Sequence, residues 1–202
     1  LQRSLGGLGK IHHLLVNYTT AESLYLKAIP IAERICAYRD LSLLYSNYCQ
    51  LLTELGRFAQ ALPAGEQSRR YAIRAHDEEG QVRIQLKLAR LYHDLRQAEF
   101  ARKMCVEARA LAQRRSYLRH YHRAGALLAD ILTQEKKFEA ARRLYDDYLN
   151  YLTESGNYFE RHGYLAKKAD TYKDEGAPYY DEAVALYQRA SQEAAKAKLE
   201  YY

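Results

Sequence analysis

The chain has 202 residues, of which 48% are hydrophobic and 28% are charged, and it contains only 10 Gly and 3 Pro. This composition excludes an intrinsically disordered chain, and so few helix-breaking residues favour long helices joined by short loops. No apolar run approaches the roughly 20 residues that a membrane-spanning helix needs, so no membrane partner is expected. No signal peptide is visible, and the cytoplasm is the favoured compartment without being established.

The formal net charge of +6 is unevenly distributed. Residues 1–122 carry 19 Lys and Arg against 11 Asp and Glu, whereas residues 123–202 carry 12 against 14. The first part of the chain is therefore expected to attract anions. The cysteines, Cys36, Cys49 and Cys105, lie far apart without a CxxC pair, so we expect buried reduced thiols and neither a disulfide nor a zinc site.

A short pattern, an aromatic residue followed three positions later by alanine, recurs along the chain. It occurs as Tyr18–Ala21, Phe58–Ala61, Phe138–Ala141 and Tyr180–Ala183, and Ala98–Ala101 is a copy without the aromatic residue. The second residues of these copies are separated by 40, 40, 40 and 42 positions. Intervals this regular indicate an internal structural repeat.

Each copy continues along one face of a helix. The positions four and seven residues after the alanine are aromatic or small in every copy, as in Tyr25 and Ala28, and this spacing is that of one helical face. Twelve residues before the alanine stands a small residue, such as Gly9 or Cys49, which would let two helices approach closely. Each unit is therefore predicted to be an antiparallel helical hairpin. We place the units at residues 1–40, 41–80, 81–120, 121–160 and 161–202, in one repeat domain that we expect to be a fragment of a longer protein.

The three prolines fall at different places in this scheme. Pro63 is expected near the first turn of a second helix, where a missing N–H costs little. Pro30 lies deeper in its helix and is expected to kink it. Pro178 is expected to mark a longer turn in the fifth unit, which carries about two extra residues.

These features resemble the tetratricopeptide repeat (TPR) family over essentially the whole chain. The resemblance lies in the small residue of the first helix, the "LGRFAQA" turn and the Ala-x3-aromatic-x2-Ala run of the second helix. A period of 40–42 is similar to the long-helix variety found in kinesin light chain and in the sensor region of the bacterial maltose-regulon activator. The resemblance implies an all-α, right-handed superhelical solenoid of about five antiparallel hairpins.

The sequence contains no strong motif for nucleotide binding, metal binding or catalysis. "LGGLGK" (Leu5–Lys10) lacks the preceding strand and the Ser or Thr of a phosphate-binding loop. The seven histidines show no metal-binding spacing, and no nucleophile–base pairing or paired carboxylates stand out. We therefore predict no enzyme activity, no metal and no cofactor. The basic clusters "RRYAIR" and "RRSYLRHYHR" leave nucleic-acid binding as a less favoured alternative.

The first helices of a stack of hairpins line its concave side, which is the default site for a peptide. The repeat register predicts the following peptide-binding residues: Lys10, His13, Asn47, Gln50, Arg83, Lys87, Arg90, His93 and Arg123. Asp130 and Lys167 fall on the same face. Arg83, Lys87 and Arg90 form one basic stripe, and guanidinium groups suit carboxylates because they can bind them in a bidentate manner.

Some TPR domains bind the acidic C-terminal tails of heat-shock chaperones through a set of polar and basic residues that clamp the carboxylates. Asn47, Arg83 and Lys87 match residues of that clamp. Gly6 replaces its first-unit Lys and Lys10 replaces its first-unit Asn, so the resemblance implies an anionic, carboxylate-bearing segment and not that specific ligand. We predict a non-catalytic scaffold that binds a protein or peptide, and we expect the partner to be acidic. The alternatives are a sensing module attached to an effector domain and a nucleic-acid-binding solenoid, and the terminal repeats could also self-associate.

Overall fold

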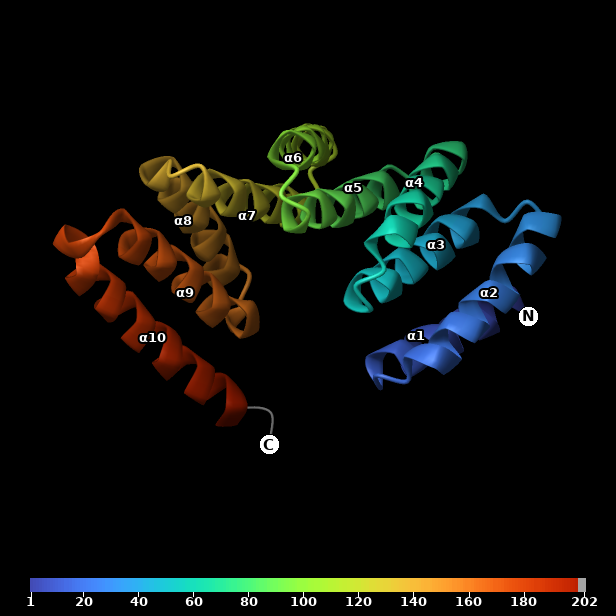
Figure 1. The fold of residues 1–202 in the computed structure, drawn as a ribbon, viewed down its shortest axis with the longest axis horizontal. Helices are drawn as coiled ribbons and strands as arrows, with labels where there is room; N and C mark the ends of the chain where they lie inside the picture. The colour runs from blue at the N-terminus through green and yellow to red at the C-terminus, as the bar shows by residue number, and fades with distance from the viewer. Residues whose placement is uncertain (200–202) are drawn as a thin grey trace. The chain divides into compact units, whose positions relative to one another are not determined.

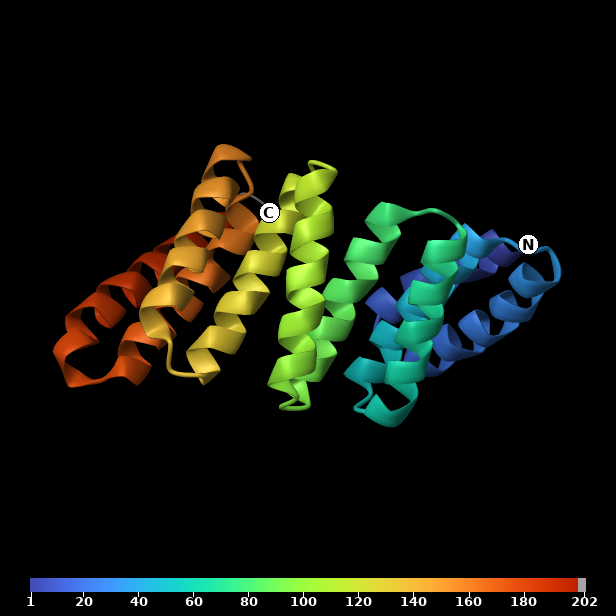
Figure 2. The same ribbon diagram turned by 90° about the horizontal axis from the view of Figure 1, so that it is seen from above.

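The computed structural model describes residues 1–199, and these residues form α-helices without any β-strand (Figures 1 and 2). The predicted all-α fold is confirmed. The helices are α1 (Gln2–Leu14), α2 (Tyr18–Arg34), α3 (Tyr38–Glu54), α4 (Phe58–Arg74), α5 (Glu78–Asp94), α6 (Ala98–Arg114), α7 (Leu118–Gln134), α8 (Phe138–Glu154), α9 (Tyr158–Glu175), the short 3-10 helix η1 (Ala177–Tyr179) and α10 (Tyr180–Leu199).

The helices are grouped into two compact units, each of which is described by itself. Unit 1 comprises Leu1–Leu111, and unit 2 begins at Ala112. In unit 1, α1 packs on α2 and α3 packs on α4, while α2 and α4 each contact the first helix of the next hairpin. In unit 2, the pairs are α7 with α8 and α9 with α10, and α8 contacts α9. Both units are therefore built from antiparallel hairpins that pack on one another in chain order.

The backbone repeats every 20 residues, which is half of the interval seen in the sequence. A residue with positive φ, between 51° and 71°, lies in each turn at positions 16, 36, 56, 76, 96, 116, 136 and 156. Its N–H bonds the carbonyl three residues earlier, and the next N–H bonds the carbonyl five residues earlier, as in Val16 to His13 and Asn17 to His12. This is the Schellman arrangement that ends a helix. Only Gly56 and Gly156 among these positions are glycines.

The fifth hairpin has a different turn. Gly176 has a φ of 122°, and η1, which contains Pro178, separates α9 from α10. The longer turn predicted there is confirmed. The two extra residues alter the start of α10, where Tyr180 is exposed, whereas the matching Tyr18 and Phe58 are half-buried.

The repeat alanines form the packed centre of the hairpins. The residues that define the repeat are all buried: Ala21, Ala61, Ala101, Ala141 and Ala183. A Cβ atom added at Gly9 would lie 2.8 Å from Cε1 of Tyr25. A Cβ atom added at Gly65 would lie 2.5 Å from Cδ2 of Leu88 and 3.2 Å from Sγ of Cys49. Small residues thus allow close helix packing, as the sequence predicts, but the glycine stands on the first helix in one hairpin and on the second helix in the next.

Two expectations were wrong in detail. Cys49 and Cys105 are buried free thiols, but Cys36 is exposed, because it occupies the positive-φ turn position between α2 and α3. Pro63 is the sixth residue of α4, which begins at Phe58, so it lies beyond the first turn. Since proline has no N–H, the bond that residue 63 would make to the carbonyl of Ala59 is absent.

Candidate peptide-binding face

The predicted peptide-binding residues of unit 1 lie on α1, α3 and α5. Helix α1 contacts α3, and α3 contacts α5, so these first helices are neighbours. We use the name first-helix face for the surface formed on them by Lys10, Asn47, Gln50, Arg83, Lys87 and Arg90. Within it Lys10 and Gln50 are exposed, and the other four residues are half-buried. Arg123 lies on α7 in unit 2 and is exposed.

A carboxylate joins α1 to α3 at one end of this face. His13 is buried, and its Nε2 lies 2.9 Å from Oε2 of Glu54. Gln50 donates from Nε2 to the other oxygen of Glu54 at 3.0 Å. Partial burial would raise the pKa of the Glu54 carboxyl, but the hydrogen bonds from Gln50 and His13 outweigh it and hold that pKa below its usual value. Two of the predicted peptide-binding residues, His13 and Gln50, therefore already bind a carboxylate of the protein itself.

A lysine joins α5 to α3 in the middle of the face. Lys87 donates from Nζ to the backbone carbonyl of Ser46 at 3.3 Å, and Asn47 is the next residue on α3. The same ammonium group acts on the buried thiol of Cys49: burial raises the pKa of that thiol, and the charge of Lys87 partly opposes the rise. A cation of α5 is thus held against the backbone of the adjoining helix α3.

The basic stripe of α5 is accompanied by acidic residues at the start of the helix. Asp77 is the N-cap of α5 and accepts a hydrogen bond from the N–H of Gly80 at 2.9 Å. Arg83 lies 3.8 Å from Asp77 and 4.0 Å from Glu79, and Arg39 of α3 approaches Asp77 to 3.7 Å. Both ion pairs of Arg83 are long and its side chain is 41% exposed, so they hold it only weakly, although Asp77 itself is largely buried.

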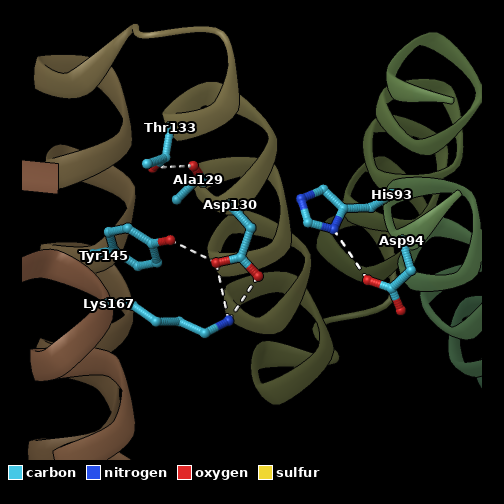
Figure 3. A network of polar contacts seen from close by, with 7 residues as sticks. All are labelled: His93, Asp94, Ala129, Asp130, Thr133, Tyr145 and Lys167. Carbon is cyan, nitrogen blue, oxygen red and sulfur yellow. Dashed lines mark hydrogen bonds and ion pairs between the residues drawn. The ribbon is translucent and has the colours of Figure 1, made fainter. Parts of the chain in front are cut away.

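His93 lies at the other end of α5. Its Nδ1 is 3.3 Å from Oδ1 of Asp94, and the ring is directed toward that carboxylate (Figure 3). Its side chain is largely buried. His93, like His13, is thus part of the framework around the face more than of its accessible surface.

In unit 2, Asp130 of α7 and Lys167 of α9 form an ion pair with each other. The ammonium group of Lys167 and the hydroxyl group of Tyr145 both point at the carboxylate of Asp130 (Figure 3). Lys167 approaches one carboxylate oxygen to 2.7 Å, and Tyr145 donates to the other at 2.5 Å. Because Asp130 is buried, these bonds compensate a charge that would otherwise be costly. The sequence placed Asp130 and Lys167 on one face but did not predict this pairing.

A second set of contacts in unit 2 surrounds Glu160. Its carboxylate accepts hydrogen bonds from Arg119 at 2.9 Å and from Tyr148 at 2.8 Å. Burial would raise the pKa of Glu160, but these hydrogen bonds and the charge of Arg123 hold it below its usual value. Arg123 therefore faces a carboxylate of the protein as well as solvent.

Sequence reasoning missed a shallow, open surface groove of about 440 Å3 between α2, α3 and α4. Tyr45 and Tyr48 of α3, Leu26 of α2 and Pro63 of α4 contribute to its lining. At one side Arg57 donates to both oxygens of Glu22 at 2.8 Å, and Glu22 also accepts from the hydroxyl of Tyr48 at 3.1 Å. The residues that line it come from three helices, and they share no regular spacing in the sequence from which it could have been predicted.

Residues 1–199 contain no group of three or more His, Cys, Asp or Glu that could hold a metal ion. Among the helices that the structure describes, none combines the length and the apolar character required to cross a membrane.

No family model matches the sequence, and a comparison with curated proteins finds no match. Solved structures do match. BtubC (BKLC) from P. vanneervenii is 20% identical, with a TM-score of 0.81 over 99% of this chain and 81% of the other. A Signal Transduction ATPase with Numerous Domains (STAND) protein with a tetratricopeptide repeat sensor, from Pyrococcus horikoshii, is 18% identical, with a TM-score of 0.81 over 95% of this chain and 30% of the other.

The nearly identical TPR-like repeats of a Podosopora anserina protein described as a kinesin light chain are 16% identical, with a TM-score of 0.73 over 97% of this chain and 95% of the other. At such identities the similarity concerns the fold. The fold is that of TPR-like helical repeat proteins, and the predicted resemblance is confirmed at that level.

Proposed function

We propose that this chain is a non-catalytic protein-interaction module whose first-helix face binds an acidic, carboxylate-bearing peptide segment. The observation that carries the proposal is the contact of Lys87 with the carbonyl of Ser46, because it holds a cation of α5 against the backbone of α3, one residue before Asn47. Arg83 and Arg90 flank Lys87 on the same helix. A carboxylate placed there would meet donors from two helices at once.

The acidic residues around the face limit where a peptide carboxylate could bind. Glu54 lies at the α1 side and Asp77 at the start of α5, so the most basic part of the face is the segment from Arg83 to Arg90. Arg83 is the residue best able to reach a ligand, since its ion pairs are long and about two-fifths of its side chain is exposed. The expected ligand is therefore short at this point, with one or two carboxylates and not a continuous acidic run.

The test is a binding screen of short peptides with free and amidated C-termini, read by fluorescence anisotropy. The double variant Arg83→Ala/Lys87→Ala should lose acidic peptides that the wild type binds. The matched control is Arg70→Ala/Lys103→Ala, which removes the same charge from exposed positions on the second helices α4 and α6. Equal loss in both variants would show a general charge effect, and equal binding to all three proteins would reject the face.

A second candidate function is a sensing module of a multidomain regulator. It is favoured by the open groove between α2, α3 and α4 and by the likeness to a STAND protein that has a tetratricopeptide repeat sensor. In that case a small ligand or a side chain would bind in the groove beside Leu26 and Pro63. The substitution Leu26→Arg would then abolish ligand-induced thermal stabilisation, while Arg83→Ala/Lys87→Ala would leave it unchanged.

A further inference from the structure

A lysine occupies the same repeat position on two first helices. Lys87 of α5 and Lys167 of α9 are two repeats apart in the sequence. Lys167 holds a carboxylate of its own unit, since its Nζ lies 2.7 and 3.0 Å from the two oxygens of Asp130 (Figure 3). Lys87 donates to a neutral acceptor, the backbone carbonyl of Ser46, at 3.3 Å. Because a carboxylate is the stronger acceptor for an ammonium group, unit 2 indicates what this position binds best.

The residue opposite the lysine differs between the two units. Asp130 stands on α7 at the position that Gln50 occupies on α3, two repeats earlier. Asp130 is buried, whereas Gln50 is exposed. The amide of Gln50 donates to Glu54, one turn later on α3. The carbonyl that Lys87 contacts belongs to Ser46, one turn before Gln50. The amide at position 50 is thus engaged on the side away from the lysine contact.

The second helix supplies a further donor to the carboxylate only in unit 2. The hydroxyl group of Tyr145 on α8 donates to Asp130 at 2.5 Å. The matching residue of α4 is Gly65, and a Cβ atom added there would lie against the side chain of Leu88. A carboxylate beside Gln50 would therefore be held at the surface by the basic residues of α5, and not buried under a tyrosine.

A neighbouring arginine shows a similar difference between the units. Arg83 of α5 and Arg123 of α7 share one position of the register, one repeat apart. The charge of Arg123 acts on the carboxylate of Glu160, which belongs to the next first helix of unit 2. The ion pairs of Arg83, by contrast, are long and join it to the start of its own helix. An external carboxylate would therefore meet only weak internal competition at Arg83.

We propose that the ligand carboxylate binds beside Gln50, against Lys87, in the way that the carboxylate of Asp130 binds Lys167. The residue at this register position decides whether a hairpin binds an external carboxylate or supplies its own. An acid there closes the position, as in unit 2, and a neutral residue leaves it open, as in unit 1. This inference rests on the proposed function, to which it adds the place of the carboxylate and the residue that controls access to it.

The first test introduces into unit 1 the acid that unit 2 carries. A labelled peptide that ends in Glu-Glu with a free C-terminus is titrated against the wild type and Gln50→Asp, and binding is followed by fluorescence anisotropy. The introduced carboxylate should pair with Lys87 and weaken peptide binding about tenfold or more. Two controls should bind within about threefold of the wild type. Gln50→Asn shortens the same side chain without adding charge, and Gln60→Asp adds the same charge at an exposed position of α4.

The second test empties the matching position of unit 2. Asp130→Ala removes the carboxylate that Lys167 and Tyr145 bind, and formate is the probe because it is the smallest carboxylate. Sodium formate should raise the melting temperature of Asp130→Ala more than that of the wild type, whereas sodium chloride at equal ionic strength should not. The matched control is Asp170→Ala. Asp170 also accepts hydrogen bonds from a lysine and a tyrosine, but its side chain is 44% exposed, against 7% for Asp130.

The outcomes separate this inference from the proposed function. Absence of peptide binding to the wild type would reject the proposed function and the ligand position beside Gln50 together. Peptide binding that Gln50→Asp leaves unchanged, or that Gln50→Asn or Gln60→Asp weakens equally, would overturn the inference alone. Equal effects of formate on Asp130→Ala and Asp170→Ala would overturn it too, because the opened position would then not bind a carboxylate.

Discussion

Tyr25 and Tyr145 occupy the same repeat position in two hairpins, and both side chains are buried. Their hydroxyl groups have different surroundings. That of Tyr145 donates to the carboxylate of Asp130 at 2.5 Å, whereas that of Tyr25 has no hydrogen-bond partner among the residues the structure describes. The same substitution, tyrosine to phenylalanine, should therefore have opposite effects on stability at the two positions.

The magnitudes follow from the environment of each hydroxyl. A buried hydroxyl without a partner costs about 1–3 kcal/mol of lost hydration. Tyr25→Phe should raise the free energy of unfolding by about 1 kcal/mol, because the small void left behind offsets part of the gain. A hydrogen bond to a charged group is worth about 1.5–3 kcal/mol, so Tyr145→Phe should lower the free energy of unfolding by about 2 kcal/mol. Lys167 still compensates Asp130, which keeps the loss below that of an unpaired buried charge.

The assay is urea unfolding followed by far-ultraviolet circular dichroism, since the chain contains no Trp. The midpoint should rise for Tyr25→Phe and fall for Tyr145→Phe, with unchanged dependence on urea concentration. Shifts of the same sign, or a lower midpoint for Tyr25→Phe, would refute the reasoning from hydroxyl satisfaction.

Alkaline pH gives an independent check on Tyr25. Burial, with the nearby Glu54 as a smaller cause, raises the pKa of Tyr25 from 10.0 to about 12. The folded chain thus keeps a proton that the unfolded chain releases above pH 10. The stability contributed by this group therefore falls as pH rises from 10 to 12, and Tyr25→Phe should lose less stability than wild type over that interval.

Three further predictions concern the turns, the close packing and acid pH. Gly56→Val should lower the free energy of unfolding by about 1–2 kcal/mol, because a β-branched residue is strained at positive φ. Val16→Gly at the equivalent turn should raise the free energy of unfolding by up to about 1 kcal/mol. Urea midpoints that move in other directions would contradict this reasoning. Gly9→Leu should lower the melting temperature by forcing a side chain into the tyrosine ring packed on it, whereas Gly7→Ala, which has open space, should gain about 0.5–1 kcal/mol. Because the pKa of Glu54 is lowered in the folded chain, its stabilising contribution is present at neutral pH and is lost as pH falls through that pKa. Glu54→Gln should therefore reduce the loss of unfolding free energy between neutral and acid pH. An unchanged dependence of stability on pH would be evidence against the bonds from His13 and Gln50.

The sequence by itself determined the helical hairpins. The repeat alanines predicted where helices meet, and the structure buries all of them, because side chains at 3.6-residue periodicity must cover a common core. The two extra residues before Ala183 likewise predicted the altered turn that Gly176 and η1 form. These features are local or strictly periodic, so they can be read from spacing alone.

Only the tertiary structure decided which polar groups meet. Nothing in the spacing predicted that His13 and Gln50 share Glu54, or that Asp130 binds Lys167 and Tyr145. Long side chains can reach several polar groups on other helices, and the repeat spacing does not say which of them they contact. The 20-residue backbone period was also hidden, since six of its eight turn residues are not glycine. The turn conformation is imposed there by the closing hydrogen bonds and by the packing of the two helices, which outweigh the preference of the individual residue.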